Sequence, residues 1–320
     1  MKNIIFTLKK TAYRFGRLLY VLRKNSIGKW ISILSKSRKE ILFESIILRY
    51  EGDDRYRQEI DFLKEKGTIH FIPYENRQQT ENIVAGYDAD KNLPYVVHKN
   101  RKLYFTGSWT KEKALWQYKN FIESERILGK NAFEKAPHQY QTESFCVKES
   151  DILLDIGCAE ALFALEAIDR VKKVFLFECD EIWFKPLEAT FEKEMTSGKV
   201  ILIKKHVGRE NTGNTVTIDT VLENEQYDSL FIKMDIEGCE TEVVKSCESW
   251  MQTDKEIKFS CCTYHYQDDA KKLLHFFEKN GYYTEFSEGY IMHHNDKLIK
   301  YPYFRKGVIR ASNKKHNRKS

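Results

Sequence analysis

Residues 151–160 read DILLDIGCAE, an apolar run that passes through an acid and a glycine into a predicted helix. A continuous apolar run of this kind predicts a strand that is buried on both faces of a parallel sheet. Gly157 allows an approach of backbone and ligand that a Cβ atom would block. Ala159 and Ala161 stand where dinucleotide-binding folds usually have glycine, so the stretch lacks the nest that a pyrophosphate needs. Taken alone, it fits a ligand-binding turn and an ordinary turn between strand and helix equally well.

Downstream of residue 151, predicted strands alternate with predicted helices. This alternation implies a parallel sheet with helices on both faces, and right-handed crossovers make the sheet doubly wound. The predicted fold class is therefore α/β, mostly parallel with antiparallel closing strands, plus an N-terminal α+β extension. The predicted strands are 151–156, 173–178, 200–204, 229–234 and 257–263, the closing strands are 283–286, 290–293 and 307–310, and the helices are 160–168, 181–195, 239–250 and 268–280.

A second acid, Glu178, ends the strand that follows Gly157, at a spacing of about 20 residues. An acid at this position can accept hydrogen bonds from the two vicinal hydroxyls of a ribose. A glutamate that simply faces solvent at a strand end is the alternative, and the spacing favours the ribose.

Charged side chains crowd the end of a later strand, in residues 230–240, which read LFIKMDIEGCE. Ligands bind at the carboxyl ends of strands in doubly wound sheets. Charges held there are costly unless they are paired or used. Lys233 can form a structural ion pair with Glu237 or Glu240, and Asp235 is predicted to be functional.

His265 follows the predicted strand 257–263 and is expected to face the same crevice. Its unperturbed pKa of about 6.5 would leave it largely neutral near neutral pH. It could then take a proton from a substrate hydroxyl, although capping of the next helix is the alternative. Asp235, Glu237 and His265 could also hold a hard divalent metal, an interpretation that the sequence favours less.

The run at 232–240 resembles the signature of FkbM-type methyltransferases, which use S-adenosylmethionine. The resemblance extends over residues 138–310 and is supported by matches at 154–157, 177–178 and 217–220. It implies a Rossmann-like methyltransferase fold and methyl transfer to an oxygen of a sugar, a polyketide or another precursor of a secreted product. The sequence departs from the pattern of that family at two positions, and neither change removes a needed functional group. Ala161 replaces a frequent glycine, and Cys179 replaces a frequent proline.

The resemblance implies a role for each candidate residue. S-adenosylmethionine carries an ammonium and a sulfonium but no phosphate, which suits nearby acids and the missing glycine nest. Glu178 would bind its ribose, and Asp235 would lie near the transferred methyl group. His265 is the leading candidate for the catalytic base, and Asp235 is the second. The methionine end of the cofactor is assigned to Asp155, Gly157, Cys158 and Glu160.

Two other classes of function stay open at this point. The first is an NAD-dependent oxidoreductase on the same fold, which the missing glycine fingerprint opposes. The second is a catalytically silent cofactor-binding module that acts as a partner at a membrane surface. The presence of both Glu178 and Asp235 argues weakly against such a module.

Charge is distributed unevenly along the chain. Residues 1–39 carry eleven Lys and Arg and no acid, and residues 297–320 carry nine and no acid. The 33 other basic residues face all 47 acidic ones, and this acidic body argues against a broad nucleic-acid-binding face. Residues 3–24 predict a helix with one apolar stripe and basic flanks, suited either to an anionic membrane surface or to packing against protein.

Cellular context and domain organisation are less sharply indicated. The seven cysteines form no CxxC pair, which indicates buried thiols in a reducing compartment. No signal peptide or membrane span is recognisable, so we expect a cytoplasmic protein, with peripheral membrane contact as an open alternative. The acceptor would be a small molecule or a glycan, and neither its identity nor the oligomeric state is indicated.

The predicted segments are a basic segment at 1–39, an accessory α+β region at 40–137, the methyltransferase domain at 138–310 and a basic tail at 311–320. Further predicted elements are helices at 41–50 and 110–128 and strands at 68–74, 93–98 and 102–105.

Overall fold

The computed structural model describes residues 37–73, 83–125, 136–294 and 299–315, and it divides the chain into two units, 1–69 and 70–320. In the first unit, α3 (Arg38–Tyr50) begins at a capping box formed by Ser37 and Glu40. After a short 3-10 turn, η1 (Asp54–Tyr56), α4 (Arg57–Lys66) follows and ends at Gly67 in the left-handed conformation. The helix predicted at 41–50 is therefore confirmed. The helix predicted at 3–24 lies outside the described residues.

The second unit begins with a small antiparallel sheet, β1 (Ala85–Asp88), β2 (Leu93–His98) and β3 (Arg101–Tyr104), followed by α5 (Lys111–Glu125). Buried side chains of β2, β3 and α5 belong to one core with helices of the larger sheet. The strands predicted at 93–98 and 102–105 are confirmed, as is the helix at 110–128 in its described part. The strand predicted at 68–74 is wrong for residues 68–73, since none of them belongs to a strand of the described chain, although Phe71 accepts a backbone bond from Met292.

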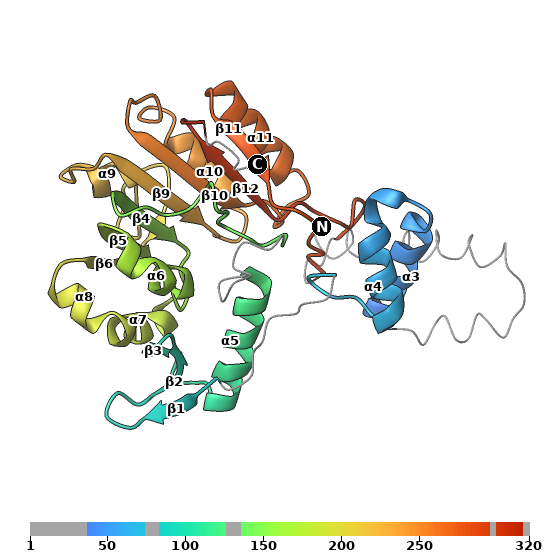
Figure 1. The fold of residues 1–320 in the computed structure, drawn as a ribbon, viewed down its shortest axis with the longest axis horizontal. Coiled ribbons are helices and arrows are strands. Elements are labelled where there is room, and N and C mark those ends of the chain that lie inside the picture. The colour runs from blue at the N-terminus through green and yellow to red at the C-terminus, as the bar shows by residue number, and fades with distance from the viewer. Residues whose placement is uncertain (1–36, 74–82, 126–135, 295–298, 316–320) are drawn as a thin grey trace, which may run out of the picture. The chain divides into compact units, whose positions relative to one another are not determined.

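A seven-stranded sheet forms the centre of this unit, in the order β11-β12-β10-β9-β4-β5-β6 (Figure 1). The five strands from β10 to β6 are parallel, and β12 runs antiparallel to both of its neighbours. The predicted α/β fold, mostly parallel with antiparallel closing strands, is confirmed. The strands are β4 (Asp151–Ile156), β5 (Lys173–Phe177), β6 (Val200–Ile203), β9 (Ser229–Met234), β10 (Glu256–Cys262), β11 (Tyr283–Phe286) and β12 (Val308–Ser312).

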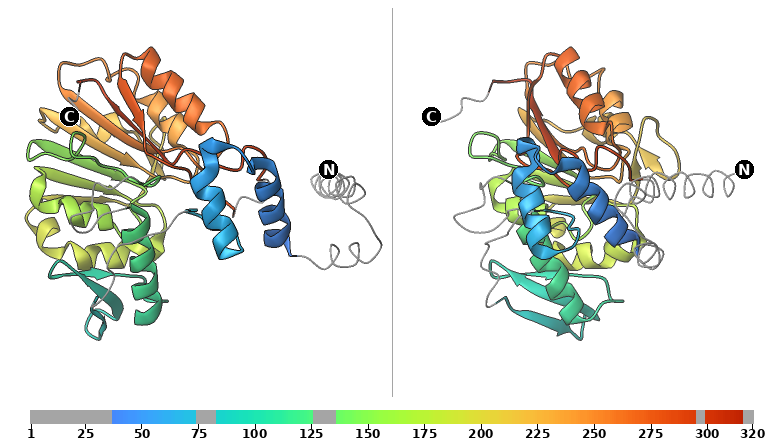
Figure 2. Two further views of the ribbon diagram at one scale, coloured as in Figure 1. Left: turned by 45° about the vertical axis from the view of Figure 1, so that its right-hand side comes forward. Right: turned by 90° about the vertical axis from the view of Figure 1, so that its right-hand side faces the viewer.

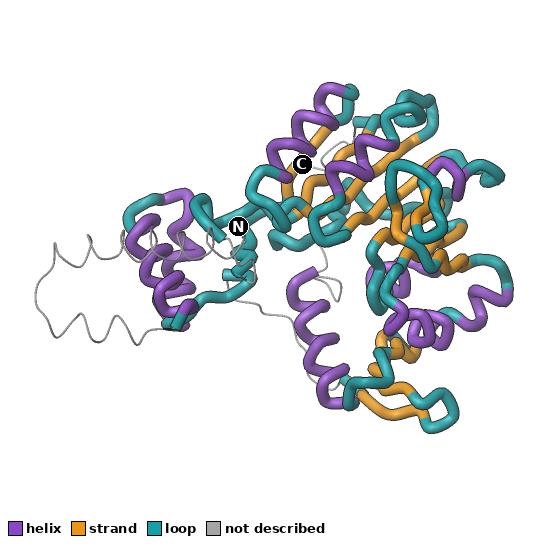
Figure 3. The backbone as a smooth tube through the Cα atoms, turned by 180° about the vertical axis from the view of Figure 1, so that it is seen from behind, coloured by secondary structure: helices purple, strands orange, loops and turns teal. Residues whose placement is uncertain are grey.

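Helices cover both faces of the sheet, as Figures 2 and 3 allow the reader to follow. One face packs on α6 (Leu162–Ala167) and α7 (Phe184–Thr190). The other face packs on α9 (Ile218–Leu222), α10 (Glu240–Ser246) and α11 (Asp269–Lys279). Because both faces are buried, successive residues of β4 contribute to two different cores, which explains its continuous apolar run.

Several predicted boundaries need correction. The helix predicted at 181–195 is divided into η3 (Glu181–Trp183), α7 and α8 (Glu192–Thr196), with a break at the buried Phe191. The strand predicted at 290–293 is reduced, in the described part of the chain, to an isolated antiparallel bridge between Ile291 and Arg305. A short parallel pair, β7 (His206–Val207) and β8 (Thr215–Val216), was not predicted. Within the described residues, no helix is long and apolar enough to cross a membrane.

Candidate functional site

The order of the strands reverses next to β4. From β4 the chain moves outward through β5 and β6, then returns to the opposite side of β4 as β9 and β10. A crevice at the carboxyl ends of the strands is expected at such a switch point. Gly157 follows β4 and Asp235 follows β9, so the two turns lie at this point.

Gly157 brings these two turns into contact. Its φ is +72°, and an added Cβ atom would lie 2.1 Å from the carbonyl oxygen of Asp235. The predicted close approach at this glycine is therefore made by the turn after β9, which leaves no space for a larger residue.

Three residues other than glycine adopt left-handed backbone conformations at this edge of the sheet. They are Ala159 (φ 47°), Ala161 (φ 60°) and Glu237 (φ 57°). This conformation costs about 1–2 kcal/mol for each residue with a Cβ atom. Strain of this kind gathers at ligand sites, where the surrounding structure enforces it.

Lys233 connects the two turns from inside the sheet. Its Nζ donates to the carbonyl oxygen of Gly157 at 3.0 Å and lies 3.0 Å from Oδ1 of Asp155. Burial raises the pKa of Asp155, and Lys233 opposes that rise. The sequence also allowed a structural ion pair of Lys233 with Glu237 or Glu240, whereas the structure pairs Lys233 with Asp155 on the adjacent strand. Asp155 thus meets Lys233 inside the sheet.

Glu160 is a buried carboxylate that forms no ion pair with any described residue, although Lys233 lies near enough to lower its pKa. Its side chain lies in the turn after β4, and Oε2 makes no hydrogen bond to any described residue. Burial raises the pKa of Glu160 to about 7. A buried carboxylate oxygen without a hydrogen-bond partner is costly in the free protein unless a ligand uses it.

Glu178 holds the turns after β4 and β5 together. Its carboxylate accepts backbone N–H groups from Ala159 (2.9 Å), Cys179 (2.7 Å) and Asp180 (2.8 Å). Cys158 is buried in the same turn, and burial raises the pKa of its thiol well above the ordinary value. Both side chains therefore lie in the turns that follow β4 and β5. The carboxylate of Glu178 already accepts three backbone N–H groups within the protein.

Asp235 lies at the centre of a ring of aromatic side chains. Tyr140 donates to its Oδ2 at 3.1 Å, and Tyr264 lies 3.3 Å from both oxygens. The Nε2 atoms of His138 and His265 lie 3.5 and 3.3 Å from the carboxylate. Burial alone would raise the pKa of Asp235, but the two histidines outweigh it and hold that pKa below its ordinary value. Asp235 is therefore ionised.

His265 has carboxylates on both sides. Its Nδ1 lies 3.0 Å from Glu240 and its Nε2 lies 3.3 Å from Asp235 and 3.7 Å from Glu237. Burial alone would lower the pKa of His265, but the carboxylates outweigh it and raise the pKa to about 9. This pKa lies above the ordinary value of about 6.5 from which the neutral form of His265 was expected, and it favours a protonated imidazole near pH 7.

No protein-family model matches the chain, and no curated protein matches it. Among solved structures, it is similar to the methyltransferase FkbM from Methylobacillus flagellatus KT, with 16% identity and a TM-score of 0.43 over 62% of this chain and 53% of that one. The chain therefore spans about half the length of that protein.

Two further solved structures illustrate the same likeness. The precorrin-6y C5,15-methyltransferase from Geobacter metallireducens GS-15 has 17% identity and a TM-score of 0.35, over 52% of this chain and 82% of that one. TYW2 from M. jannaschii, solved in complex with AdoMet, has 13% identity and a TM-score of 0.39, over 72% and 88%.

Two members of the site were missed in the sequence. His138 and Tyr140 come from the segment that precedes β4, and both are buried beside Asp235. His138 and Tyr140 stand two positions apart in the sequence, and the chain forms a turn at residues 137 and 138. That spacing was the available signal, but the segment has no other strand-like pattern.

The possible metal site that the sequence suggested, with Asp235, Glu237 and His265 as ligands, needs one of these residues to be replaced. The Glu237 side chain is 89% exposed, and Glu240 takes its place in a group with Asp235 and His265 whose ligand atoms lie within 4.8 Å of one another. A second group of the same kind contains His138, Asp235 and Cys262.

The raised pKa of Glu160 leads to a prediction about stability. Because this pKa lies above the usual value near 4.3, the fold binds a proton that the unfolded chain releases. Stability is then lost as the pH rises through about 7. Glu160→Gln should remove this loss, so that its melting temperature exceeds that of the wild type by a few degrees at pH 8 and not at pH 5. Calorimetry should find no such crossover for Glu181→Gln, an exposed acid; equal behaviour of the two variants would contradict the assignment.

Proposed function

We propose that the chain is an S-adenosylmethionine-dependent methyltransferase that acts on a hydroxyl oxygen of a sugar or a related small-molecule or glycan precursor. The observation that carries the proposal is the buried carboxylate of Glu160, whose Oε2 has no hydrogen-bond partner among the described residues, in a strained turn at the switch point. A ligand that brings an ammonium group to this turn would complete it, and S-adenosylmethionine has one.

The other residues of the turn support the same cofactor. A carboxylate offers about four acceptor positions, so the three backbone donors of Glu178 leave roughly one for a ribose hydroxyl. Gly157 and Cys158 would line the methionine end, while Asp155 would act through Lys233 by fixing the turn. S-adenosylmethionine, when bound, supplies a methyl group that its sulfonium activates.

Asp235 and His265 are proposed as the catalytic pair, with their roles exchanged relative to the sequence-based expectation. Asp235 is ionised, and it would orient the acceptor hydroxyl and accept its proton. His265 is protonated, and it would hold Asp235 in place through the contact of 3.3 Å. A base within hydrogen-bond reach contributes about 10²–10⁴-fold to such a reaction.

Calorimetric titration with S-adenosylhomocysteine tests the cofactor. The wild type should bind it, and Glu178→Ala should bind it about 10- to 100-fold more weakly, because a hydrogen bond to a charged group contributes roughly 1.5–3 kcal/mol. Glu160→Gln, which keeps the volume of the side chain, should also weaken binding at pH 8.

Glu181→Gln serves as the control, since it removes an exposed acid from the same region and should leave affinity unchanged. The proposal would be overturned if the wild-type protein bound NADH and did not bind S-adenosylhomocysteine.

A further inference from the structure

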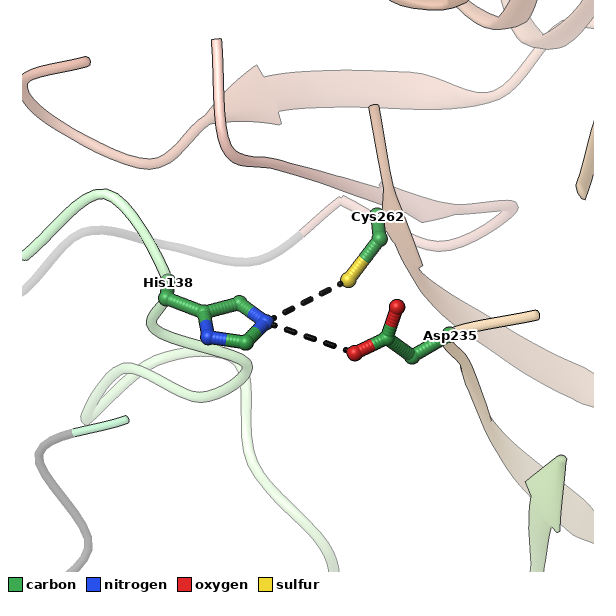
Figure 4. Close-up of side chains that lie close together, drawn as sticks. All are labelled: His138, Asp235 and Cys262. Carbon is green, nitrogen blue, oxygen red and sulfur yellow. Dashed lines mark hydrogen bonds and ion pairs between the residues drawn. The ribbon is translucent and has the colours of Figure 1, made fainter. Parts of the chain in front are cut away.

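Four donor atoms of different chemistry surround one point at the carboxyl ends of β9 and β10. Three of them belong to His138, Asp235 and Cys262, which Figure 4 draws together. Nε2 of His138 lies 3.5 Å from Oδ2 of Asp235 and 3.5 Å from Sγ of Cys262. The fourth atom is the hydroxyl oxygen of Tyr140, at 2.9 Å from the histidine, 3.1 Å from the aspartate and 3.5 Å from the cysteine.

These five spacings, with the Asp235 and Cys262 ligand atoms within 4.8 Å of each other, are compatible with the corners of a tetrahedron. A regular tetrahedron with edges of about 3.3 Å has its centre about 2.0 Å from each corner, which is the length of a Zn–N or Zn–O bond. The longer Zn–S bond of about 2.3 Å requires longer edges at the sulfur. In agreement with this longer bond, Sγ of Cys262 lies 3.5 Å from the hydroxyl oxygen of Tyr140 and 3.5 Å from Nε2 of His138.

We propose that this chain binds one Zn²⁺ ion between His138, Asp235, Cys262 and Tyr140. The donor set excludes Mg²⁺ and Ca²⁺, which prefer oxygen ligands, because it contains a thiol and an imidazole. The Asp235 carboxylate, through Oδ2, and the Cys262 thiolate balance the charge of a divalent ion, and Oδ1 of Asp235, which faces His265, is left to act on the acceptor. Zinc would displace the thiol proton of Cys262 to solvent as the Zn–S bond forms.

The position of the four residues suits a metal site. Cys262 is the last residue of β10, and Asp235 directly follows the adjacent strand, so the sheet itself fixes two of the ligands. His138, Tyr140 and Cys262 are buried, while the Asp235 side chain is 21% exposed, so an ion could reach the group from solvent on the side of Asp235.

The neighbouring group of Asp235, Glu240 and His265 is less suited to hold the ion. Oε1 of Glu240 accepts the backbone N–H of Ile236 at 2.8 Å and lies 3.0 Å from the imidazole of His265. Glu240 therefore already engages two groups of the protein, and this group brings three donor atoms together where the first brings four.

Metal binding can be measured on the full-length protein without cofactor or acceptor. Protein that is stripped with chelator and reloaded should retain about one Zn²⁺ per chain after gel filtration. Co²⁺ in its place should give the strong visible absorption of a tetrahedral site and a near-ultraviolet charge-transfer band from the thiolate. Cys262→Ser should abolish that band, and His138→Ala should weaken zinc binding by more than roughly 100-fold, since loss of even an outer-sphere partner costs 10–100-fold.

Cys261→Ser is the matched control. Cys261 is equally buried on the same strand, but it contributes to the core on the opposite face of the sheet. It should keep the zinc content and the charge-transfer band. Zinc that is absent from reloaded wild type, an octahedral cobalt spectrum or equal loss in both serine variants would overturn the site. Calorimetry with S-adenosylhomocysteine is independent of these readouts, so failure of the zinc site and failure of the proposed function can be distinguished.

Discussion

Gly157→Ala is expected to lower the free energy of unfolding by about 2–5 kcal/mol and to abolish binding of S-adenosylhomocysteine. The new Cβ atom would meet the carbonyl oxygen of Asp235 at 2.1 Å, and the alanine would also have to adopt a φ of +72°. Forced packing costs about 1–3 kcal/mol and the left-handed backbone another 1–2 kcal/mol. The turns after β4 and β9 would have to separate, which would open the crevice. Urea denaturation and calorimetry measure the two effects.

Gly198→Ala separates crowding from backbone strain. Gly198 has almost the same φ, +74°, but an added Cβ atom would meet nothing within 4 Å. This variant should lose only about 1–2 kcal/mol and keep its affinity for the cofactor product. Equal losses at the two positions would mean that the contact between the turns is unimportant.

Asp235→Asn is expected to lower turnover by at least about 10²-fold while the melting temperature stays within a few degrees. Asparagine keeps the size of the side chain and one acceptor oxygen, but it can neither take the acceptor's proton nor stabilise a protonated His265. Release of S-adenosylhomocysteine in the presence of a hydroxylated acceptor measures turnover, and metal content is measured in parallel.

Glu237→Gln is the control for this experiment, because it removes a neighbouring carboxylate whose side chain is 89% exposed. Its turnover should remain within a few-fold of the wild type. Full turnover by Asp235→Asn would transfer the base to another residue.

The sheet could be predicted from the sequence because its strands are buried on both faces. The runs that became β4 and β9 are apolar throughout, and right-handed crossovers restrict how such strands can be ordered. Residues 68–73 and 290–293 also contain apolar stretches, but these stretches did not form strands. A strand needs a partner along its whole length, and that partner depends on the tertiary structure.

The site was predictable only where its residues end strands. Asp235, Glu178 and His265 follow strands, so the topology itself brings them to one edge. His138 and Tyr140 arrive from a segment without regular periodicity. The charge of His265 could not be predicted, since it depends on Glu240, which contacts it only in the folded chain.

The left-handed alanines at 159 and 161 bear on how the free protein meets its ligand. Glycine at these positions would relieve the strain, but it would also let the turn sample many more backbone conformations. Alanine allows fewer backbone conformations than glycine, and the surrounding contacts hold it in this one. The turn therefore has a single conformation before a ligand binds. A rigid turn loses little conformational entropy on binding, and the affinity of the crevice would then depend on contacts rather than on the ordering of a loop.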